Sequence, residues 1–296
     1  MRQTEKITNW RKTGVPWMVG AILSFVLMAI SARELSAELS AVQILFWRSL
    51  TGALLMPVIL SICGWNHIKT RQPGLQVTRG AIHFVAQYGW FFGITMIPLA
   101  DVFALEFTAP IWTVLFASLF LGERLSFGRL VAVSLGFGGV LIILRPGVEV
   151  IEPAAVVVLI SAALYAVTYV MVKTLTKTDS PLCIMFYMSF VQLALATAAS
   201  AANWAAPSSA GLWPWLVLVG ASGLTAHYCI AQALTRSDAS TVMPIDFCRL
   251  PMIMFVGFWF YSENVDPWVF IGALVIVIGN YLNIRNESVR IPDNQK

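Results

Sequence analysis

The sequence is poor in charge. Only 11% of its 296 residues are Asp, Glu, Lys or Arg, against about 25% in a typical soluble domain. Hydrophobic residues make up 58% of the chain, and the mean hydropathy is +0.77. A water-soluble fold needs more polar side chains than this to cover its surface. The composition therefore excludes a soluble enzyme and a disordered chain.

Paired cysteines and nucleotide motifs are also missing. The sequence has no CxxC or zinc-type spacing, which excludes a disulfide scaffold and gives no metal or redox signal. It has no Walker P-loop, so ATP hydrolysis within this chain has no support. We expect no cofactor, no metal and no nucleic-acid partner. The four cysteines are Cys63, Cys183, Cys229 and Cys248.

Long apolar runs fill nearly the whole chain. A membrane-spanning helix needs about 20 mostly apolar residues, and ten runs of suitable length and composition follow one another with short gaps. The sequence thus predicts an all-α membrane protein with ten transmembrane helices. The runs are 16–32, 41–63, 80–98, 101–121, 127–144, 153–172, 181–203, 213–234, 240–261 and 267–284.

Lysine and arginine alternate with these runs. If the N-terminus is cytoplasmic, the inside segments hold fifteen of them, including Arg79 before the third run. The outside loops hold two, Arg33 and Arg145, and two more, Arg48 and Arg249, lie within runs. Cytoplasmic loops carry the excess of positive charge. We therefore expect both tails, 1–15 and 285–296, in the cytoplasm and the protein in the inner (plasma) membrane.

The chain repeats itself with a constant shift of 140 residues, here called the repeat offset. The matched pairs extend over five successive runs, which predicts two repeats, 16–145 and 153–284. Because five is odd, the second repeat enters the membrane from the opposite side, as in many secondary transporters, whose substrate sites lie near the midplane. The pairs that define the repeat offset are Phe46 with Phe186, Gly80 with Gly220, Tyr88 with Tyr228, Glu106 with Asp246, and Glu123 with Glu263.

Several short motifs resemble those of a known family. Pro98-Leu-Ala-Asp101, Phe107-Thr-Ala-Pro110, Leu121-Gly-Glu123 and Gly136-Phe-Gly-Gly139 are similar to the EamA-type family of the drug/metabolite transporter superfamily. The resemblance covers most of the chain and is closer in the first half. It implies ten helices in two EamA domains and the transport of small organic solutes. Members handle amino acids, riboflavin, S-adenosylmethionine or opine-type metallophores.

Ionisable residues stand within the apolar runs, where lipid would reject them. We predict that they face a watery cavity and bind substrate, together with polar and aromatic neighbours. An aromatic wall from two of the eleven tryptophans would suit a ring-bearing or cationic solute. The predicted substrate-binding residues are Arg48, His83, Gln87, Tyr88, Glu106, His227, Tyr228, Asp246, Arg249, Trp47 and Trp90.

These residues also admit a purely structural interpretation. Arg48 could extend toward the membrane surface, Arg249 could neutralise Asp246 three residues away, and the histidines could be packing residues. In the functional interpretation an arginine fork binds a carboxylate or phosphate. Glu106 or Asp246 then binds an ammonium group or carries a proton. Both interpretations stay open at this point.

Small residues and prolines suggest how the helices pack and bend. Gly89 and Gly93 form a small-xxx-small face that permits close helix contact, with Cys229 and Ala233 at the matching positions. The fifth and tenth runs carry no interior charge, which favours scaffold or dimer helices. Bending points within runs are predicted at Pro110, Pro244 and Pro251.

The leading functional hypothesis is a secondary transporter that works by alternating access. Its cargo would be a small polar or zwitterionic metabolite, such as an amino acid or an opine metallophore, exported in exchange for protons. The alternative is an uptake transporter for riboflavin or S-adenosylmethionine. An intramembrane enzyme is the hypothesis from another class, and only His227-x-Cys229 hints at it. We expect no enzyme, and a homodimer stays open.

Overall fold

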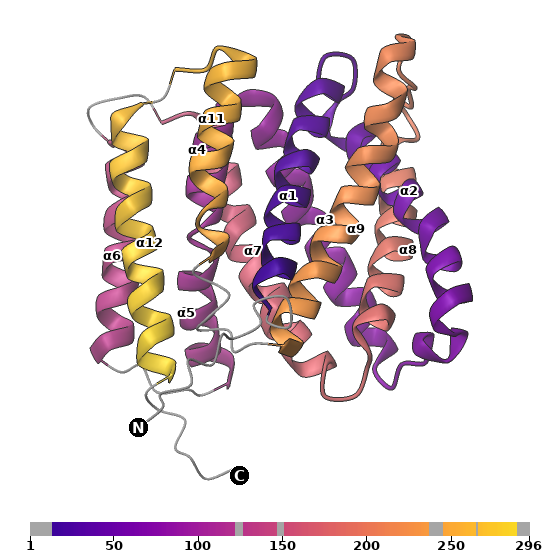
Figure 1. The fold of residues 1–296 in the computed structure, drawn as a ribbon, viewed down its shortest axis with the longest axis horizontal. Coiled ribbons are helices and arrows are strands. Elements are labelled where there is room, and N and C mark those ends of the chain that lie inside the picture. Colours follow the sequence, from indigo (N-terminus) through magenta and orange to yellow (C-terminus); the bar gives the residue numbers. More distant parts are fainter. Residues whose placement is uncertain (1–13, 122–126, 147–150, 237–244, 265, 289–296) are drawn as a thin grey trace, which may run out of the picture.

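The computed structural model describes residues 14–121, 127–146, 151–236, 245–264 and 266–288, and they form a bundle of α-helices joined by short turns (Figure 1). Glu123, Pro244 and most of the two tails lie outside the described residues. The long helices are α1 (Val15–Leu35), α2 (Ala41–Cys63), α3 (Pro73–Met96), α4 (Leu99–Glu106), α5 (Ala109–Leu121), α6 (Phe127–Leu144), α7 (Pro153–Leu175), α8 (Pro181–Ser200), α9 (Trp213–Arg236), α11 (Arg249–Tyr261) and α12 (Pro267–Ser288).

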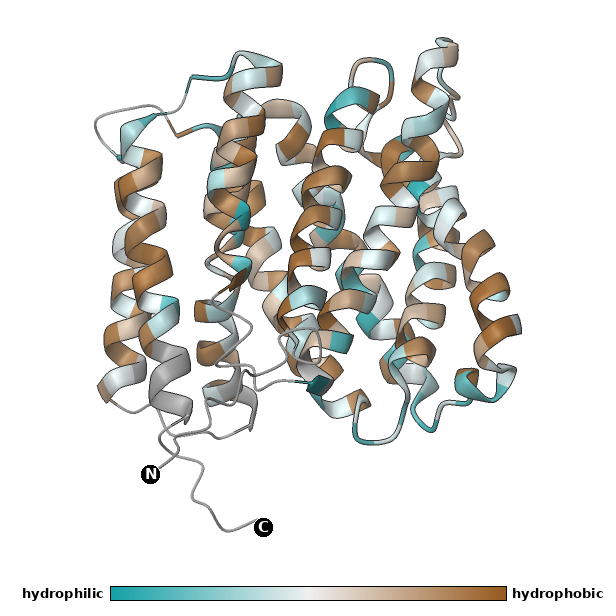
Figure 2. Cartoon of the chain, viewed as in Figure 1, coloured by the Kyte–Doolittle hydropathy of each residue, from teal (hydrophilic) through white to brown (hydrophobic). Residues whose placement is uncertain are grey.

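Apolar residues dominate these helices along most of their length (Figure 2). Within the described residues, six stretches are long and apolar enough to cross a membrane, judged by length and composition. Three shorter apolar helices accompany them, at Leu130–Leu144, Arg249–Tyr261 and Pro267–Leu282. The all-helical prediction is confirmed, whereas ten membrane crossings stay a prediction. The six stretches are Val15–Leu35, Ala41–Cys63, Leu99–Phe116, Pro153–Leu175, Pro181–Ser200 and Ala210–Ala233.

The third helix corrects the sequence analysis. The run 80–98 was expected to start the span, with Arg79 in the preceding loop, but α3 begins at Pro73. Arg79 lies within the helix and is only 6% exposed. The first two turns carry Gln76 and Arg79 on their buried face, so a search for apolar runs excludes them although they are helical. Hydropathy detects burial in lipid but not burial in protein.

The helices α6 and α12 lie side by side at one edge of the molecule (Figure 1) and pack closely enough for their backbones to touch. A Cβ placed on Gly139 would lie 2.6 Å from the carbonyl oxygen of Gly272. Further along α12, a Cβ on Gly279 would lie 2.9 Å from the carbonyl oxygen of Ala132. Advancing along α12 thus means going back along α6, so the two helices run antiparallel.

These two contacts are the same contact made twice. The repeat offset carries Gly139 onto Gly279 and Ala132 onto Gly272. Helices at equivalent places in the two proposed repeats therefore meet head to tail around a pseudo-two-fold axis. That is the packing expected of a scaffold pair without interior charge.

The same exchange relates contacts at the other edge of the bundle. A Cβ on Gly220 of α9 would lie 2.4 Å from Cβ of Thr51 in α2. A Cβ on Gly80 of α3 would lie 2.8 Å from Cγ1 of Val191 in α8. The repeat offset relates Gly80 to Gly220 and Thr51 to Val191. The offset in the sequence is therefore an offset in packing as well.

The small-residue face of α3 packs against α7 as its spacing predicts. A Cβ on Gly89 would overlap the Ser161 hydroxyl, and one on Gly93 would overlap the Val158 side chain. In the other half, Cys229 of α9 approaches Gly20 of α1, whose added Cβ would lie 3.2 Å from the Cys229 sulfur. Close contact between α3 and α7, and between α9 and α1, frames the space between the halves.

The fourth predicted span is broken in the middle. Helix α4 ends at Glu106 and α5 begins at Ala109, with Pro110 at the start of the second piece. The side chain of Asn280 in α12 donates a hydrogen bond of 2.8 Å to the Phe107 carbonyl that the break leaves unpaired. Non-helical backbone at such depth is tolerated where protein supplies the missing bond.

A matching break precedes α11. The repeat offset carries the turn at Phe107 and Thr108 onto the turn at Phe247 and Cys248, and Pro251 follows within the first turn of α11. The last residues before the two breaks are Glu106 and Asp246. Both acidic side chains thus stand where a helix is interrupted, a place that transporters use for ligands.

Contacts between helix ends join segments that the charge pattern assigns to the same side. At the predicted outer side, Arg33 forms an ion pair of 2.9 Å with Glu263, and the Tyr261 hydroxyl donates to Glu34 at 2.9 Å. At the predicted inner side, Ser180 donates to the carbonyl of His67 at 3.1 Å. The alternation of the helices is thereby supported.

The close contact of α6 and α12 yields a first prediction. Gly139→Ala forces a methyl group against the α12 backbone and should destabilise the protein by about 1–3 kcal/mol. Gly138→Ala is the matched control, because nothing lies within 4 Å of its Cβ position and alanine is favoured over glycine in a helix. Thermal unfolding of the purified protein in detergent measures both, and equal melting temperatures would contradict the packing.

The turn between α7 and α8 yields a second prediction. The Asp179 carboxylate accepts hydrogen bonds from Thr70 and from Gln76, the latter at 2.8 Å. Burial raises the pKa of Asp179, but these bonds and one from Thr178 outweigh it and hold the pKa below the ordinary 3.8. Asp179→Asn should cost about 1 kcal/mol of stability at pH 7.

The pH dependence of this loss has a definite sign. Because the folded-state pKa is lowered, the ionised carboxylate stabilises the fold fully above about pH 4 and loses this effect as the pH falls through the lowered pKa. Wild type and Asp179→Asn should therefore converge in melting temperature on acidification. A difference independent of pH would show that the charge of Asp179 contributes nothing.

Candidate substrate cavity

A small cavity lies between the two halves. Its walls come from α1, α3, α4, α7 and α9, so both repeats contribute. Aromatic, amide, imidazole and carboxylate groups all face it, which makes it chemically mixed rather than oily. The lining residues are Phe25, Met28, His83, Gln87, Trp90, Glu106, Tyr165, Tyr169 and His227.

The cavity lies on the pseudo-two-fold axis that relates the two halves. The repeat offset carries Phe25 onto Tyr165 and Gln87 onto His227, and all four line the cavity. Two residues at equivalent positions can line the same cavity only if that cavity lies on the pseudo-two-fold axis that exchanges the halves. Each pair combines two chemically different side chains, so the cavity is symmetric in shape and asymmetric in chemistry.

An ionic cluster adjoins the cavity at Glu106. Nη2 of Arg249 lies 3.1 Å from Glu106 and 3.3 Å from Asp246. The Trp90 indole donates a hydrogen bond of 2.8 Å to the other oxygen of Glu106. The Arg249 guanidinium also packs on the Phe25 ring, with its carbon 4.6 Å from the ring centroid. These contacts bring together four residues that the sequence analysis predicted for the site.

This cluster has more negative than positive charge. Two carboxylates share one guanidinium, and one oxygen of Asp246 and two nitrogens of Arg249 have no hydrogen-bond partner within the described part of the chain. The structural interpretation of Arg249 therefore holds in part, because it does pair with Asp246. It pairs with Glu106 of the other half as well, and the surplus carboxylate can take up a proton or a cationic group.

The two predicted histidines are in edge-on ring contact at the wall of the cavity. The rings of His83 and His227 lie 5.9 Å apart, and the Tyr165 ring lies 5.2 Å from His83. His83 is 2% exposed, and neither of its ring nitrogens has a hydrogen-bond partner among the residues described. A packing histidine would use at least one nitrogen, so His83 has hydrogen-bonding capacity available for a ligand.

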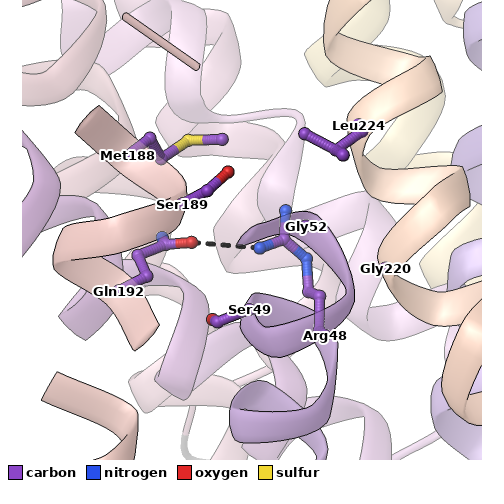
Figure 3. Close-up of a pocket in the computed structure, with 8 residues that line it drawn as sticks. All are labelled: Arg48, Ser49, Gly52, Met188, Ser189, Gln192, Gly220 and Leu224. Atoms are coloured by element: carbon purple, nitrogen blue, oxygen red, sulfur yellow. Dashed lines mark hydrogen bonds between the residues drawn. The ribbon is translucent and has the colours of Figure 1, made fainter. Parts of the chain in front are cut away.

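Arg48 reaches the cavity through two glutamines. Its Nη1 donates to Gln192 of α8 at 3.0 Å, and the Gln192 amide donates to Gln87 at 2.9 Å. Figure 3 shows the Arg48 side chain directed at Gln192 beside a second, smaller pocket. Arg48 is 5% exposed, so it does not extend toward the membrane surface.

Three predicted site residues lie elsewhere. Tyr88 is 38% exposed and stacks on Phe92, and Tyr228 is 39% exposed and meets the edge of Trp17. Each directly follows a residue that faces the cavity, so it points to another side of its helix. Trp47 packs in an aromatic cluster, 6.1 Å from Trp204.

The sequence analysis overlooked several lining residues. Tyr165 and Tyr169, four positions apart, present one phenolic face of α7 to the cavity, and Gln192 connects Arg48 to Gln87. The repeat offset matches Tyr165 to Phe25, but neither residue was predicted for the site, because one aromatic residue among many in a membrane helix does not stand out. Uncharged polar residues such as Gln192 are equally inconspicuous to a search for buried charge.

The fold and the cavity define a class before any comparison: a multi-pass membrane protein with two similar halves around a polar cavity. The comparisons are more specific. The EamA-like transporter family model matches residues 12–145 and again 152–285. The chain therefore belongs to this family and carries two copies of its domain, as the resemblance implied. The starts of the two matches, at 12 and 152, differ by the same repeat offset that relates the helix contacts.

Curated relatives match over nearly their whole length. A riboflavin transporter of Brucella anthropi is 30% identical over 259 residues, covering 84% of this chain and 89% of the relative. An S-adenosylmethionine uptake transporter of Rickettsia felis is 23% identical and covers 93% and 94%. A pseudopaline exporter of Pseudomonas aeruginosa is 29% identical and covers 90% and 94%. These relatives are all transporters of small metabolites.

A solved crystal structure shares the fold. It superposes with a TM-score of 0.67, covers 94% of this chain and 98% of its own, and has 15% sequence identity. The arrangement of the helices is thus retained at an identity where side chains are largely replaced.

The ionic cluster yields a third prediction. Arg249→Met leaves Glu106 and Asp246 buried without a counter-charge and should destabilise the protein by about 3–5 kcal/mol. Adding Glu106→Gln in the same chain should recover part of the loss, because only one carboxylate then stays charged. Thermal unfolding in detergent tests this cycle. A double variant no more stable than Arg249→Met would show that the pair does not interact.

Proposed function

We propose that this protein is a secondary transporter for a small, amphoteric organic metabolite. The observation that carries the proposal is a cavity between two similar halves, lined by residues at equivalent positions and by Glu106, whose carboxylate pairs with the buried Arg249. Membership of the EamA-like family and the printed names of its relatives support a metabolite as cargo.

Alternating access is the mechanism we propose, with ten spanning helices in two inverted repeats, 16–145 and 153–284. The antiparallel packing of α6 on α12 and the exchanged glycine contacts support the inversion. Two halves in nearly the same packing environment can exchange their conformations, and the exchange moves the opening of the cavity from one side to the other. The breaks at Phe107 and Phe247 are the bending points we assign to this motion.

We place the protein in the inner membrane of a bacterium with both termini in the cytoplasm, as the distribution of Lys and Arg favours. The direction we propose is export coupled to protons. Uptake of a metabolite such as riboflavin or S-adenosylmethionine is the second candidate, because relatives with those names align over 93% and 94% of this chain, and the exporter aligns over 90%. Direction is a property of coupling, so it is tested through the coupling group.

Glu106 is the group to which we assign proton coupling, with Asp246 as its partner. Arg249 contacts both carboxylates through one nitrogen, Nη2, so it cannot satisfy both fully. A proton or a cationic group of the cargo can occupy the remaining negative charge, but not both together. Such competition for one carboxylate is the simplest form of antiport.

The enzyme hypothesis loses its only motif in this arrangement. His227 faces the cavity, whereas Cys229, two residues on, packs with Met18, Ala21 and Ile22 of α1. The two side chains therefore point to different sides of α9 and cannot act as a nucleophile and its base. Flux of an unaltered solute in proteoliposomes separates a transporter from an enzyme.

The proposal yields a fourth prediction. A screen for thermal stabilisation by amino acids, riboflavin, S-adenosylmethionine and opine-type compounds identifies cargo for flux measurements in proteoliposomes. Glu106→Gln should reduce accumulation driven by a pH gradient at least ten-fold, because the amide cannot release a proton. Exchange of labelled for unlabelled cargo without a gradient should continue with weakened affinity, since binding does not require proton release but the amide no longer attracts the cationic group of the cargo.

Glu152→Gln is the matched control, since this exposed glutamate at the start of α7 loses the same charge outside the cavity. It should transport like the wild type. If Glu106→Gln retains pH-driven transport at the wild-type rate, Glu106 is not the coupling group. If no solute moves in any variant, including the wild type, the transporter proposal itself is wrong.

A further inference from the structure

Two arginines in the first half are buried without a counter-ion. Arg48 of α2 is 5% exposed and Arg79 of α3 is 6% exposed. In contrast to Arg249, which contacts two carboxylates, neither forms an ion pair with any acidic side chain that the structure describes. Nε of Arg48, and Nε and Nη1 of Arg79, have no hydrogen-bond partner within the described ranges.

The two guanidiniums belong to one electrostatic environment. Arg79 and His83 lie four residues apart on the buried side of α3, so their side chains leave the helix on the same face. His83 lines the main cavity. Arg48 borders the smaller pocket and reaches the main cavity through Gln192 and Gln87. This side of the cavity therefore carries uncompensated positive charge, opposite in sign to the Glu106 cluster.

Uncompensated charge in a membrane protein has to be explained. Burial of a charged group without a partner is strongly unfavourable even after relaxation, and this structure buries two such cations. A fold that needed these groups only for packing would do better with apolar residues. Indeed the equivalent positions in the second half are Met188 and Val219, which fill the same helices without charge. Buried unpaired ionisable groups in membrane helices mark a ligand by default.

The surroundings of Arg48 leave room for its fork. Gly223 of α9 lies against the guanidinium, and a Cβ there would come within 3.0 Å of both Nε and Nη2. The position equivalent to Gly223 in the first half is His83. Thus α9 has a glycine where the guanidinium lies, and α3 has at the equivalent position an imidazole whose nitrogens can bind a ligand. Planar forks of this kind bind carboxylates and phosphates through paired hydrogen bonds.

We propose that Arg48 and Arg79, together with His83, form a subsite for an anionic group of the cargo, a carboxylate or a phosphate. The inference rests on the proposed function, because it assigns part of the same cavity. It adds a polarity: the anionic end of the cargo lies toward Arg48 and Arg79, and its cationic end lies toward Glu106 and Asp246. A neutral molecule would leave two buried guanidiniums unpaired, so an anionic group is required.

Binding of simple anions to the purified protein in detergent tests this subsite without knowledge of the cargo. The probes are inorganic phosphate and succinate, titrated at constant ionic strength against chloride, with the melting temperature as the readout. We expect saturable stabilisation of the wild type by at least one probe. Arg48→Gln and Arg79→Gln should each weaken the apparent affinity at least ten-fold. Arg71→Gln, an exposed arginine near the start of α3, should bind like the wild type.

Lysine variants address the case in which a glutamine variant fails to fold. Arg48→Lys and Arg79→Lys keep the charge but lose the fork, so they should fold and retain weakened binding. Absence of stabilisation by both probes, or equal stabilisation of the wild type and all four buried-arginine variants, would overturn the proposal. An effect equally reduced in Arg71→Gln would also overturn it, because the anion would then act on surface charge.

The outcome is distinguishable from that of the transport experiment. If anions bind through Arg48 and Arg79 but no metabolite moves in proteoliposomes, the subsite stands and the proposed function fails. If a metabolite without any anionic group is transported at the same rate by the wild type, Arg48→Gln and Arg79→Gln, the protein is a transporter and the subsite is wrong. Each result therefore falls on one proposal alone.

Discussion

Backbone contact between equivalent helices is the constraint on which the rest of this structure depends. Where Gly139 meets Gly272, and Gly279 meets Ala132, no side chain separates α6 from α12. Lipid offers no hydrophobic drive for two helices to associate, so close packing of small residues has to hold them together. A contact that tight permits one register only. It fixes how the halves face each other and hence where the cavity between them lies.

Polar chemistry follows from that register. Equivalent positions of the halves meet near the exchange axis, so some positions occur twice in the same cavity, as Phe25 with Tyr165 and Gln87 with His227 do. At one pair the chain keeps the same chemistry, with Glu106 and Asp246 both acidic. At another it differentiates, with Gln87 and His227. Duplication supplies the geometry, and divergence of the paired residues supplies a ligand site that is not itself symmetric.

Sequence could predict as much as it did because the relevant signals are periodic or rare. The repeat offset reappears as contacts, and Glu106 and Arg249 are conspicuous because lipid excludes charge. Rarity fails where a residue is common, so Tyr165 and Gln192 attract no notice. The sequence also could not predict where α3 begins. The analysis places Arg79 in a loop, but α3 starts at Pro73 and includes it. The polar side chains in its first turns are buried against other helices and not exposed to water, which hydropathy cannot show.

The distribution of charge between the halves completes the physical picture. All three arginines buried in the described helices have apolar residues at the equivalent positions: Met188 for Arg48, Val219 for Arg79 and Ala109 for Arg249. Contacts that build the scaffold, by contrast, occur in both copies. Packing has to work in either half if the halves exchange conformations, whereas a ligand's charged group needs to be met only once. The packing contacts are therefore symmetric because both halves take part in the motion, and the buried arginines are asymmetric because they serve to bind the cargo.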